Sequence, residues 1–196
     1  MPQIPLFPLK NVLFPLGRMP LQIFEQRYLN MVKRSMKENN GFGIVAIRHG
    51  MEVGPSVVIY EVGVLAEIID WNQLSNGLLG ITVVGVKPFR VLHTERQADE
   101  LLMGEVEYFP VEEKLVVPQE LTHLKALLQN LLEHSVVQKL EMTCDFDNAS
   151  DVSWLLSYLL PFEPAIKVEL LSIQSPIERL EKIVKNLDSM TEQLNK

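Results

Sequence analysis

The chain has 196 residues, 47% apolar and 22% charged, which is enough for one domain or two small ones around a sizeable core. Its 25 acidic residues outnumber its 18 basic residues, and the resulting formal charge of -7 argues against general nucleic-acid affinity. No apolar run reaches the roughly 18 residues of a membrane span, the N-terminus lacks a signal-peptide pattern, and a single cysteine excludes an internal disulfide and a multi-cysteine metal site, so we expect a cytoplasmic protein.

The opening segment, residues 5–21, sets apolar side chains between prolines. Pro8, Pro15 and Pro20 cannot donate a hydrogen bond to a neighbouring strand. They therefore hold an extended segment, or place it at the edge of a sheet. An open strand edge of this kind can pair directly with an extended peptide.

An amphipathic helix should follow. Phe24, Tyr28, Val32 and Met36 recur every four residues, which is typical of one apolar helix face. The residues Asn39-Asn40-Gly41 should end the helix, because Asn and Gly tolerate the left-handed conformation that closes helices. Basic residues between the apolar ones predict a cationic outer face, made by Arg27, Lys33, Arg34 and Lys37.

Most of the remaining first half is strand-like, with short apolar runs rich in β-branched residues. The runs are residues 42–47, 61–70, 78–85, 91–93 and 103–109. Asn76-Gly77 lies between two of them and indicates a hairpin turn. Gly63, Gly80 and Gly85 favour bulges or sharp bends, which would curve the sheet toward closure.

From Pro118 onward the pattern is helical. Leucines between residues 121 and 132 recur with a period of about 3.6, and residues 147–151 offer N-caps for a helix over 152–159. Ser175-Pro176-Ile177-Glu178 combines a capping Ser, a Pro at the first helical position and a Glu three residues after the cap. Strands followed by helices predict an α+β layout. We expect a β-rich part over residues 1–115 and a helical part over residues 116–196.

Charge is distributed unevenly along the chain. Residues 1–50 carry a net charge of +5, residues 51–115 a net charge of -7, and residues 116–196 a net charge of -5. A basic first quarter on an acidic body could be a binding face. The interpretation that we favour is that the segments pack together and partly neutralise each other.

None of the short motifs has the context that its chemistry requires. Gly41-Phe42-Gly43 begins a dinucleotide-like pattern, but it follows a helix and precedes a strand, the reverse of the required order. The four histidines lack zinc-ligand spacing, and no serine lies in a nucleophile-elbow pattern. Cys144 adjoins Asp145, which raises rather than lowers the pKa of a thiol. We therefore predict no catalytic residue, no metal, no cofactor and no enzymatic activity.

Read as a whole, the opening segment resembles a known family. The start of the N-terminal domain of the Lon ATP-dependent proteases is similar to residues 5–17 (PLFPLKNVLFPLG) and residues 19–28 (MPLQIFEQRY). Shorter similarities follow at residues 42–45, 62–68, 84–91 and 159–180. Leu16 is a departure, because the family often has Pro-Gly directly at this point.

The resemblance implies a stand-alone member of this domain family that lacks the ATPase and protease modules. The implied fold is a PUA-like barrel or pseudobarrel with one interrupting helix, followed by a C-terminal helical bundle. In full Lon this domain helps to capture substrate polypeptides and does no chemistry. The resemblance therefore implies a non-catalytic polypeptide-binding or adaptor module.

The opening segment also supplies the expected peptide-binding residues. If its apolar side chains stay partly exposed, they would form a shallow groove for an unfolded peptide, with a polar rim at the start of the helix. The alternative is that the apolar residues are core and that Arg27 is solvated or internally paired. The candidates are Phe7, Phe14, Leu16, Met19, Leu21, Glu25, Arg27 and Tyr28.

The expected partner is an unfolded or partly folded polypeptide, and a protease or a chaperone is a further candidate. No membrane partner is expected, nucleic acid is disfavoured, and a homo-oligomer stays open. Two other functions also stay open: an RNA-binding PUA-like domain that uses the basic first quarter, and a hydrolase whose site is assembled from distant residues. RNA binding would depend steeply on salt, and a hydrolase would need a pocket that joins a nucleophile to a base.

Overall fold

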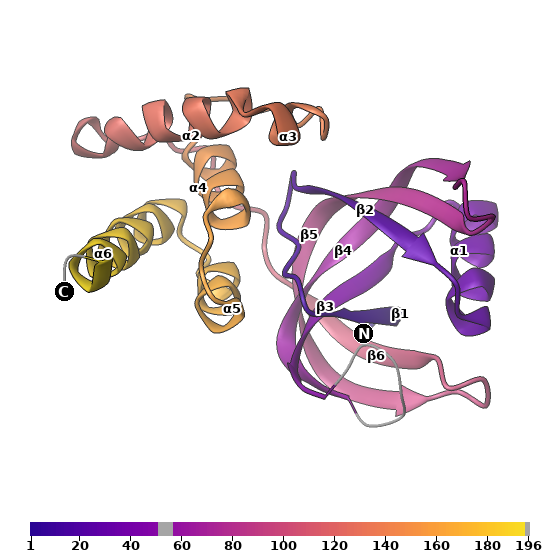
Figure 1. The fold of residues 1–196 in the computed structure, drawn as a ribbon. Coiled ribbons are helices and arrows are strands. Elements are labelled where there is room, and N and C mark those ends of the chain that lie inside the picture. Colours follow the sequence, from indigo (N-terminus) through magenta and orange to yellow (C-terminus); the bar gives the residue numbers. More distant parts are fainter. Residues whose placement is uncertain (51–56, 195–196) are drawn as a thin grey trace.

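The computed structural model describes residues 1–50 and 57–194, which form six strands with one helix, followed by a group of helices (Figure 1). The mixed arrangement confirms the predicted α+β layout. The strands are β1 (Gln3–Leu9), β2 (Arg18–Ile23), β3 (Phe42–His49), β4 (Val58–Gln73), β5 (Leu79–Arg96) and β6 (Leu102–Tyr108). The helices are α1 (Gln26–Glu38), the 3-10 helix η1 (Gln119–Leu121), α2 (His123–Glu133), α3 (Ser135–Gln138), α4 (Ala149–Leu159), α5 (Pro164–Ser172) and α6 (Pro176–Leu194).

The strands are hydrogen-bonded in the order β2-β5-β4-β3-β1-β6, and β6 also pairs with β5. β1 and β3 are parallel, and the other pairs are antiparallel. The length of β5 explains the closure, because residues 79–84 pair with β2 and residues 89–96 pair with β6. The pairings of β1, β3, β4, β5 and β6 therefore form a ring, and β2 is attached to it through β5 alone.

Gly63 and Gly85 allow neighbouring backbones to approach each other closely. A Cβ on Gly85 would collide with the carbonyl oxygen of Phe14, and a Cβ on Gly63 would lie 2.6 Å from the carbonyl oxygen of Ile44. The register between β4 and β5 shifts beside Gly85, because Val86 lies between the pairs Leu65–Lys87 and Ala66–Gly85, and the register between β3 and β4 shifts next to the pair Val45–Gly63. The irregularities predicted at these two glycines are therefore confirmed, whereas Gly80 pairs with no shift beside it.

The predicted hairpin turn, the end of α1 and the N-terminal caps of α4 and α6 are confirmed. Gly77 has a φ of 82° in the turn between β4 and β5, and Asn39 has a φ of 52° at the end of α1. The side chain of Asn148 accepts a hydrogen bond from the Ser150 N–H at the start of α4 (3.2 Å). Ser175 Oγ accepts one from the Glu178 N–H at the start of α6 (3.4 Å). Such caps satisfy N–H groups that have no partner inside the helix.

The helix α5 was not predicted. Pro164 occupies the first turn of α5. A proline is tolerated there because the first N–H groups of a helix have no partner within it.

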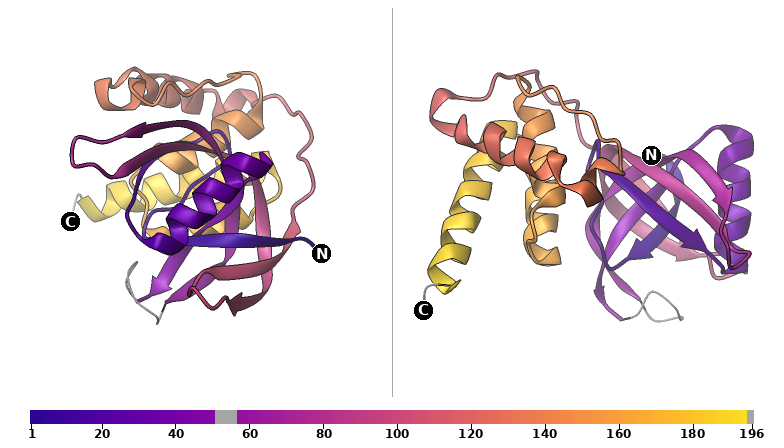
Figure 2. Two further views of the ribbon diagram at one scale, coloured as in Figure 1. Left: turned by 90° about the vertical axis from the view of Figure 1, so that its right-hand side faces the viewer. Right: turned by 45° about the horizontal axis from the view of Figure 1, so that its top comes forward.

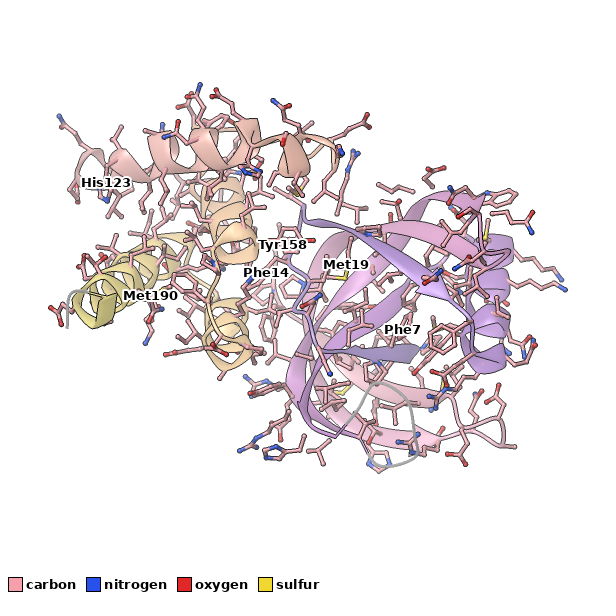
Figure 3. The ribbon with its side chains drawn as sticks, in the orientation of Figure 1. Phe7, Phe14, Met19, His123, Tyr158 and Met190 are labelled. Atoms are coloured by element: carbon pink, nitrogen blue, oxygen red, sulfur yellow. The ribbon has the colours of Figure 1, made fainter. Side chains whose placement is uncertain are left out.

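The helical part docks on the strands through α4 and α5, with α6 on the far side of α4, while α1 covers the opposite end of the ring (Figures 1 and 2). The core is continuous across this junction. The rings of Phe14 and Trp154 lie 6.0 Å apart, and Tyr158 Oη donates a hydrogen bond to the carbonyl oxygen of Arg18 (2.7 Å). Figure 3 shows Phe14 and Tyr158 where α4 meets the strands.

Candidate functional site

The largest hollow that we describe lies where the strands meet α4. It has a volume of about 500 Å³, and we call it the junction cavity. Its apolar wall comes from distant parts of the chain, including the loop before β2, the segment after β6 and α4. The apolar residues are Pro15, Leu16, Val86, Phe109, Val111 and Trp154.

The rim of the junction cavity carries charges of both signs, from Lys87, Glu112, Lys114 and Asp151. Lys114 forms an ion pair with Asp145 (3.0 Å). The hydrogen bond and charge of Asp145 raise the pKa of Lys114, and Lys114 in turn lowers the pKa of Asp145. Because the rim carries charges of both signs, an apolar side chain bound in the cavity can be flanked by acidic or by basic residues in its own sequence.

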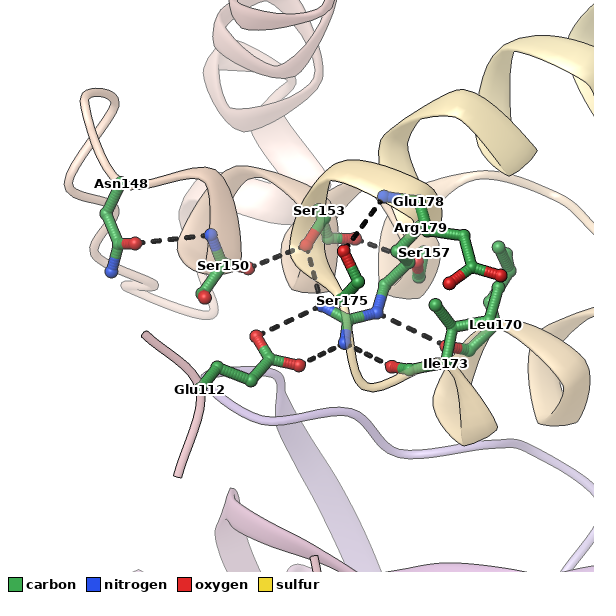
Figure 4. A network of polar contacts seen from close by, with 10 residues as sticks. All are labelled: Glu112, Asn148, Ser150, Ser153, Ser157, Leu170, Ile173, Ser175, Glu178 and Arg179. Carbon is green, nitrogen blue, oxygen red and sulfur yellow. Dashed lines mark hydrogen bonds and ion pairs between the residues drawn. The ribbon is translucent and has the colours of Figure 1, made fainter. Parts of the chain in front are cut away.

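One wall of the junction cavity is held by a buried arginine (Figure 4). Arg179, at the start of α6, has no exposed surface and forms a bidentate ion pair with Glu112 on the segment after β6. It also donates to Ser153 Oγ (2.8 Å) and to the carbonyl oxygens of Leu170 (3.3 Å) and Ile173 (2.5 Å).

Burial lowers the pKa of Arg179, and the Glu112 carboxylate opposes that shift. All five guanidinium donors have acceptors, which makes a buried charge tolerable. The network therefore fixes Glu112, and with it the cavity wall, against three helices.

A second, smaller hollow of about 180 Å³ lies between β1 and β2, and we call it the β2 hollow. Most of its wall comes from the first 28 residues, and the rings of Phe7 and Tyr28 are stacked with centroids 4.1 Å apart. Phe24 is 56% exposed at its margin. The apolar residues lining it are Phe7, Leu9, Pro20, Leu21, Ile23, Phe24 and Tyr28.

No cluster of His, Cys, Asp and Glu in the described residues is arranged to hold a metal ion. Burial, with Asp151 and Asp145 adding to it, raises the pKa of the Cys144 thiol to about 12. Burial lowers the pKa of Lys167 to about 8, and its Nζ donates to the carbonyl oxygen of Tyr158 (2.6 Å) at the end of α4. A high-pKa thiol is a poor nucleophile, and the lysine is engaged in closing a helix.

Residues 3–189 match the family model described as the ATP-dependent protease La (LON) substrate-binding domain. The chain belongs to this family. It is 27% identical to the Lon protease of Anaeromyxobacter dehalogenans over 188 residues, which cover 94% of this chain and 20% of that protein. It is 26% identical to Lon protease 2 of Myxococcus xanthus over 191 residues, with 95% and 20% covered. The chain thus spans about a fifth of the length of these Lon relatives.

Solved structures agree with this assignment. A Lon N-terminal domain protein from Xanthomonas campestris is 28% identical and superposes with a TM-score of 0.79, covering 94% of this chain and 98% of that one. The N-terminal domain of the Mycobacterium avium complex Lon protease superposes with a TM-score of 0.63 at 15% identity, covering 94% and 97%. The second likeness shows the fold alone. The resemblance to Lon N-domains predicted from the sequence is confirmed.

In this Lon domain the predicted peptide-binding residues separate into groups. Phe7, Leu21, Glu25 and Tyr28 meet at the β2 hollow, with Phe7 and Tyr28 forming a largely buried part of its lining. Leu16 lines the junction cavity instead. Four of the eight predicted peptide-binding residues thus lie at one hollow.

Three other candidates lie outside both hollows. Phe14 is completely buried and Met19 nearly so, so they pack beneath the surface. Arg27 forms an ion pair with Glu25 (2.7 Å), donates to the carbonyl oxygen of Glu100 (3.0 Å) and packs on the ring of Tyr28. It is therefore the internally paired side chain of the alternative interpretation.

Several residues of the junction cavity were missed because they come from the second half or from the segment after β6. Trp154 falls within the expected helix over 152–159 and Phe109 at the end of the strand-like run 103–109, and the sequence indicates no role for either. Val111 is 86% exposed and stands between Pro110 and Glu112, which is the signal that could have singled it out. Isolated exposed valines are common, however, so this signal alone does not indicate a site.

Proposed function

We propose that this Lon-family domain is a non-catalytic module that binds unfolded or partly folded polypeptides. The observation that carries the proposal is the junction cavity, an apolar hollow of about 500 Å³ in a chain of the substrate-binding domain family. Its size is within the range of ligand-binding pockets. An unfolded polypeptide exposes the large apolar side chains that such a hollow would remove from water.

Binding of this kind needs no reactive group. The apolar wall, with Trp154 and Phe109, would hold a side chain by burial, and the mixed rim of Lys87, Lys114 and Asp151 would tolerate many flanking sequences. Because few directional contacts are made, we expect micromolar or weaker affinity. Weak, sequence-tolerant binding suits a module that presents substrates to a protease or a chaperone.

Several finer features belong to the same proposal. The ring of strand pairings would be a PUA-like barrel, the helices after it a bundle, and the boundary between the two parts would lie between residues 115 and 116. We also propose a cytoplasmic location. None of the helices in the described residues is long and apolar enough to cross a membrane.

The direct test uses one of the two tryptophans as a reporter. In a Trp71→Phe variant, Trp154 in the junction cavity is the one remaining tryptophan, and it can be excited selectively over the tyrosines. Titration with a reduced, carboxymethylated polypeptide that lacks tryptophan should change the Trp154 emission and saturate at micromolar or higher concentration. The native form of the same polypeptide should have no effect. Absence of binding across a panel of unfolded polypeptides would contradict the proposal.

A matched pair of valines locates the binding. Val111→Glu adds a charge to the cavity wall, whereas Val136→Glu adds one to an exposed valine of α3. We expect Val111→Glu to weaken binding about tenfold, because a bound polypeptide would cover the added carboxylate and remove its hydration. Val136→Glu should bind like the parent chain. Equal effects of the two substitutions would place the binding elsewhere.

RNA binding is the second candidate, and the outer face of α1 favours it. Lys33, Arg34 and Lys37 are exposed there, and within the described residues no ion pair reaches them. RNA held by these cations would dissociate steeply as salt rises. A Lys33→Gln, Arg34→Gln, Lys37→Gln variant would then lose RNA binding and keep polypeptide binding.

A further inference from the structure

The strand β2 pairs on one side only, and the pattern of its hydrogen bonds shows which backbone groups face away from the sheet. The Gly85 N–H donates to the carbonyl oxygen of Gly17 (2.9 Å), so Gly85 of β5 faces the chain that leads into β2. Residues alternate in direction along an antiparallel pair. Met19, Leu21 and Ile23 therefore bond to β5, while Arg18, Pro20 and Gln22 direct their backbone groups outward.

Two independent observations agree with this assignment. Pro20 has no N–H, and prolines in sheets occupy positions where the missing donor would have faced away from a partner. The carbonyl oxygen of Arg18 accepts the hydrogen bond from Tyr158 Oη, so it lies on the outer side. What stays open is the carbonyl of Pro20 and both backbone groups of Gln22; both residues are exposed, and within the described residues no hydrogen bond from outside the sheet reaches these groups.

The β2 hollow lies beside this free edge. Its far wall is formed by Phe7 and Leu9 of β1. That half of β1 pairs only with β3, because its pairing with β6 ends at Leu6. The hollow thus lies between two strand edges that are not hydrogen-bonded to each other.

We propose that an extended segment of the captured polypeptide adds to the free edge of β2 as a further strand and places an apolar side chain in the β2 hollow. This inference rests on the proposed function and assigns it a second contact region and a recognition chemistry. The segment would pair with the N–H and C=O of Gln22 and with the C=O of Pro20. Every second side chain of an extended segment points the same way, so one side chain enters the hollow beside Leu21 and Phe24.

The chemistry of the edge selects the occupant. One donor flanked by acceptors at strand spacing is matched by another extended backbone. A folded protein has already paired its backbone groups, and a small apolar ligand would leave those of Gln22 unpaired by protein. The edge therefore distinguishes unfolded from folded chains by the availability of their backbone, and the hollow adds a requirement for one apolar side chain.

Pro20 limits this edge without closing it. A proline on an edge strand shortens the row of donors and so discourages a second copy of the chain from adding along it. Gln22 and the carbonyl of Pro20 still permit a short segment to pair. A partner segment of a few residues is the occupant that this arrangement accommodates.

Modified peptides test the proposal on the unaltered chain. The probe is a fluorescent seven-residue peptide of alternating leucine and threonine. It is compared with two versions of the same peptide that are N-methylated at alternate residues, so that each version lacks the backbone donors of one edge of the extended peptide. N-methylation removes backbone donors from one edge and keeps the side chains. We expect one methylated version to bind about tenfold more weakly and the other to bind like the unmodified peptide. Equal binding of all three would overturn the proposal.

A pair of substitutions at one position gives the reciprocal test. Gln22→Pro removes the outward N–H, and Gln22→Ala removes only the side chain. We expect about tenfold weaker peptide binding for Gln22→Pro and unchanged binding for Gln22→Ala. Thermal unfolding checks that the Gln22→Pro variant folds. If it does not fold, the N-methylated peptides alone test strand addition. The two proposals fail in different ways. Strand addition fails, and the proposed function stands, if unfolded polypeptides bind and Val111→Glu weakens their binding while N-methylation has no effect. The proposed function itself fails if no unfolded polypeptide binds.

Discussion

The junction cavity and the β2 hollow are built in opposite ways. The junction cavity joins segments far apart in sequence, and its wall depends on the contact of Arg179 with Glu112, 67 residues earlier. The β2 hollow is formed by residues 7–28 and held by the stacked rings of Phe7 and Tyr28. Docking of the helical part should therefore control the first hollow and leave the second largely intact.

The largest effect should come from Arg179→Met. It leaves the Glu112 carboxylate and several carbonyl groups unpaired in a buried place, and breaking a buried ion pair costs about 3–5 kcal/mol. Urea unfolding should show this loss, and the Trp154 emission of a Trp71→Phe background should report a changed junction cavity.

The matched control is Lys182→Met, which removes an ion pair of α6 with Glu169 that is largely solvent-accessible. Exposed pairs contribute between zero and about 1 kcal/mol. Equal destabilisation by the two substitutions would mean that the Arg179 network does not hold the wall. The seven-residue leucine–threonine peptide, called the β2-edge peptide from here on, should still bind to the Arg179→Met variant. Loss of that binding would mean that the two hollows are not independent.

The next effect concerns pH. Burial lowers the pKa of Lys167 to about 8 from its ordinary 10.5, so between these values the unfolded chain holds a proton that the folded chain has released. Stability then rises with pH through this window and is reduced below it. In a Cys144→Ala background, which removes the opposite trend that the raised pKa of the Cys144 thiol causes above pH 9, we expect a gain of about 1 kcal/mol between pH 8 and 10, since part of the Lys167 side chain stays in water.

Lys167→Met should remove this rise, because the titrating group is gone. Unfolding by urea at several pH values between 7 and 10 measures it. The control is Lys139→Met on the exposed surface after α3. A Cys144→Ala chain whose stability is flat over this range would contradict the prediction.

A comparable or smaller effect is expected for Tyr158→Phe. The substitution removes the hydrogen bond to the carbonyl oxygen of Arg18, and one such bond contributes about 0.5–1.5 kcal/mol. Burial raises the pKa of Tyr158 to about 12, so the hydroxyl remains a donor through pH 10. The measurement is thermal unfolding, with Tyr108→Phe as the control.

The same variant sharpens the comparison, because it frees the Arg18 carbonyl and lengthens the open edge of β2 by one acceptor. Peptide binding at this edge should be maintained or strengthened. Weaker binding would indicate that Tyr158 orients β2 and that the two hollows are coupled.

The smallest effect on stability should come from Phe24→Ala. Its side chain is 56% exposed, so we expect the free energy of unfolding to change by less than about 0.5 kcal/mol. Affinity for the β2-edge peptide should fall, because the apolar margin of the hollow is lost. The contrast is Phe14→Ala in the buried core, which should cost about 3–5 kcal/mol.

Features set by neighbouring residues could be predicted from the sequence. The helix from Gln26 to Glu38, the turn at Asn76-Gly77 and the caps at Asn148 and Ser175 all use partners within a few residues. Half of the candidate site belongs to this class, since Phe7, Leu21, Glu25 and Tyr28 surround one hollow. Their closeness follows from a short chain segment that turns back on itself.

Burial and long-range pairing could not be predicted in the same way. Phe14 and Phe24 lie in similar apolar contexts, yet Phe14 packs on Trp154 and Phe24 is exposed, because the helix begins only after Phe24. The sequence also read β5 as two separate strands, and its continuity is what lets β2, β4 and β6 pair with one strand.

By itself, the sequence determined the family, the α+β order and the absence of the short motifs of familiar enzymes, because these depend on residue types at fixed spacing. Only the tertiary structure decided which apolar side chains line a hollow and which edge of β2 stays open. The reason is physical: exposure and unpaired backbone groups depend on which distant segments pack against a strand, and local sequence does not carry that information.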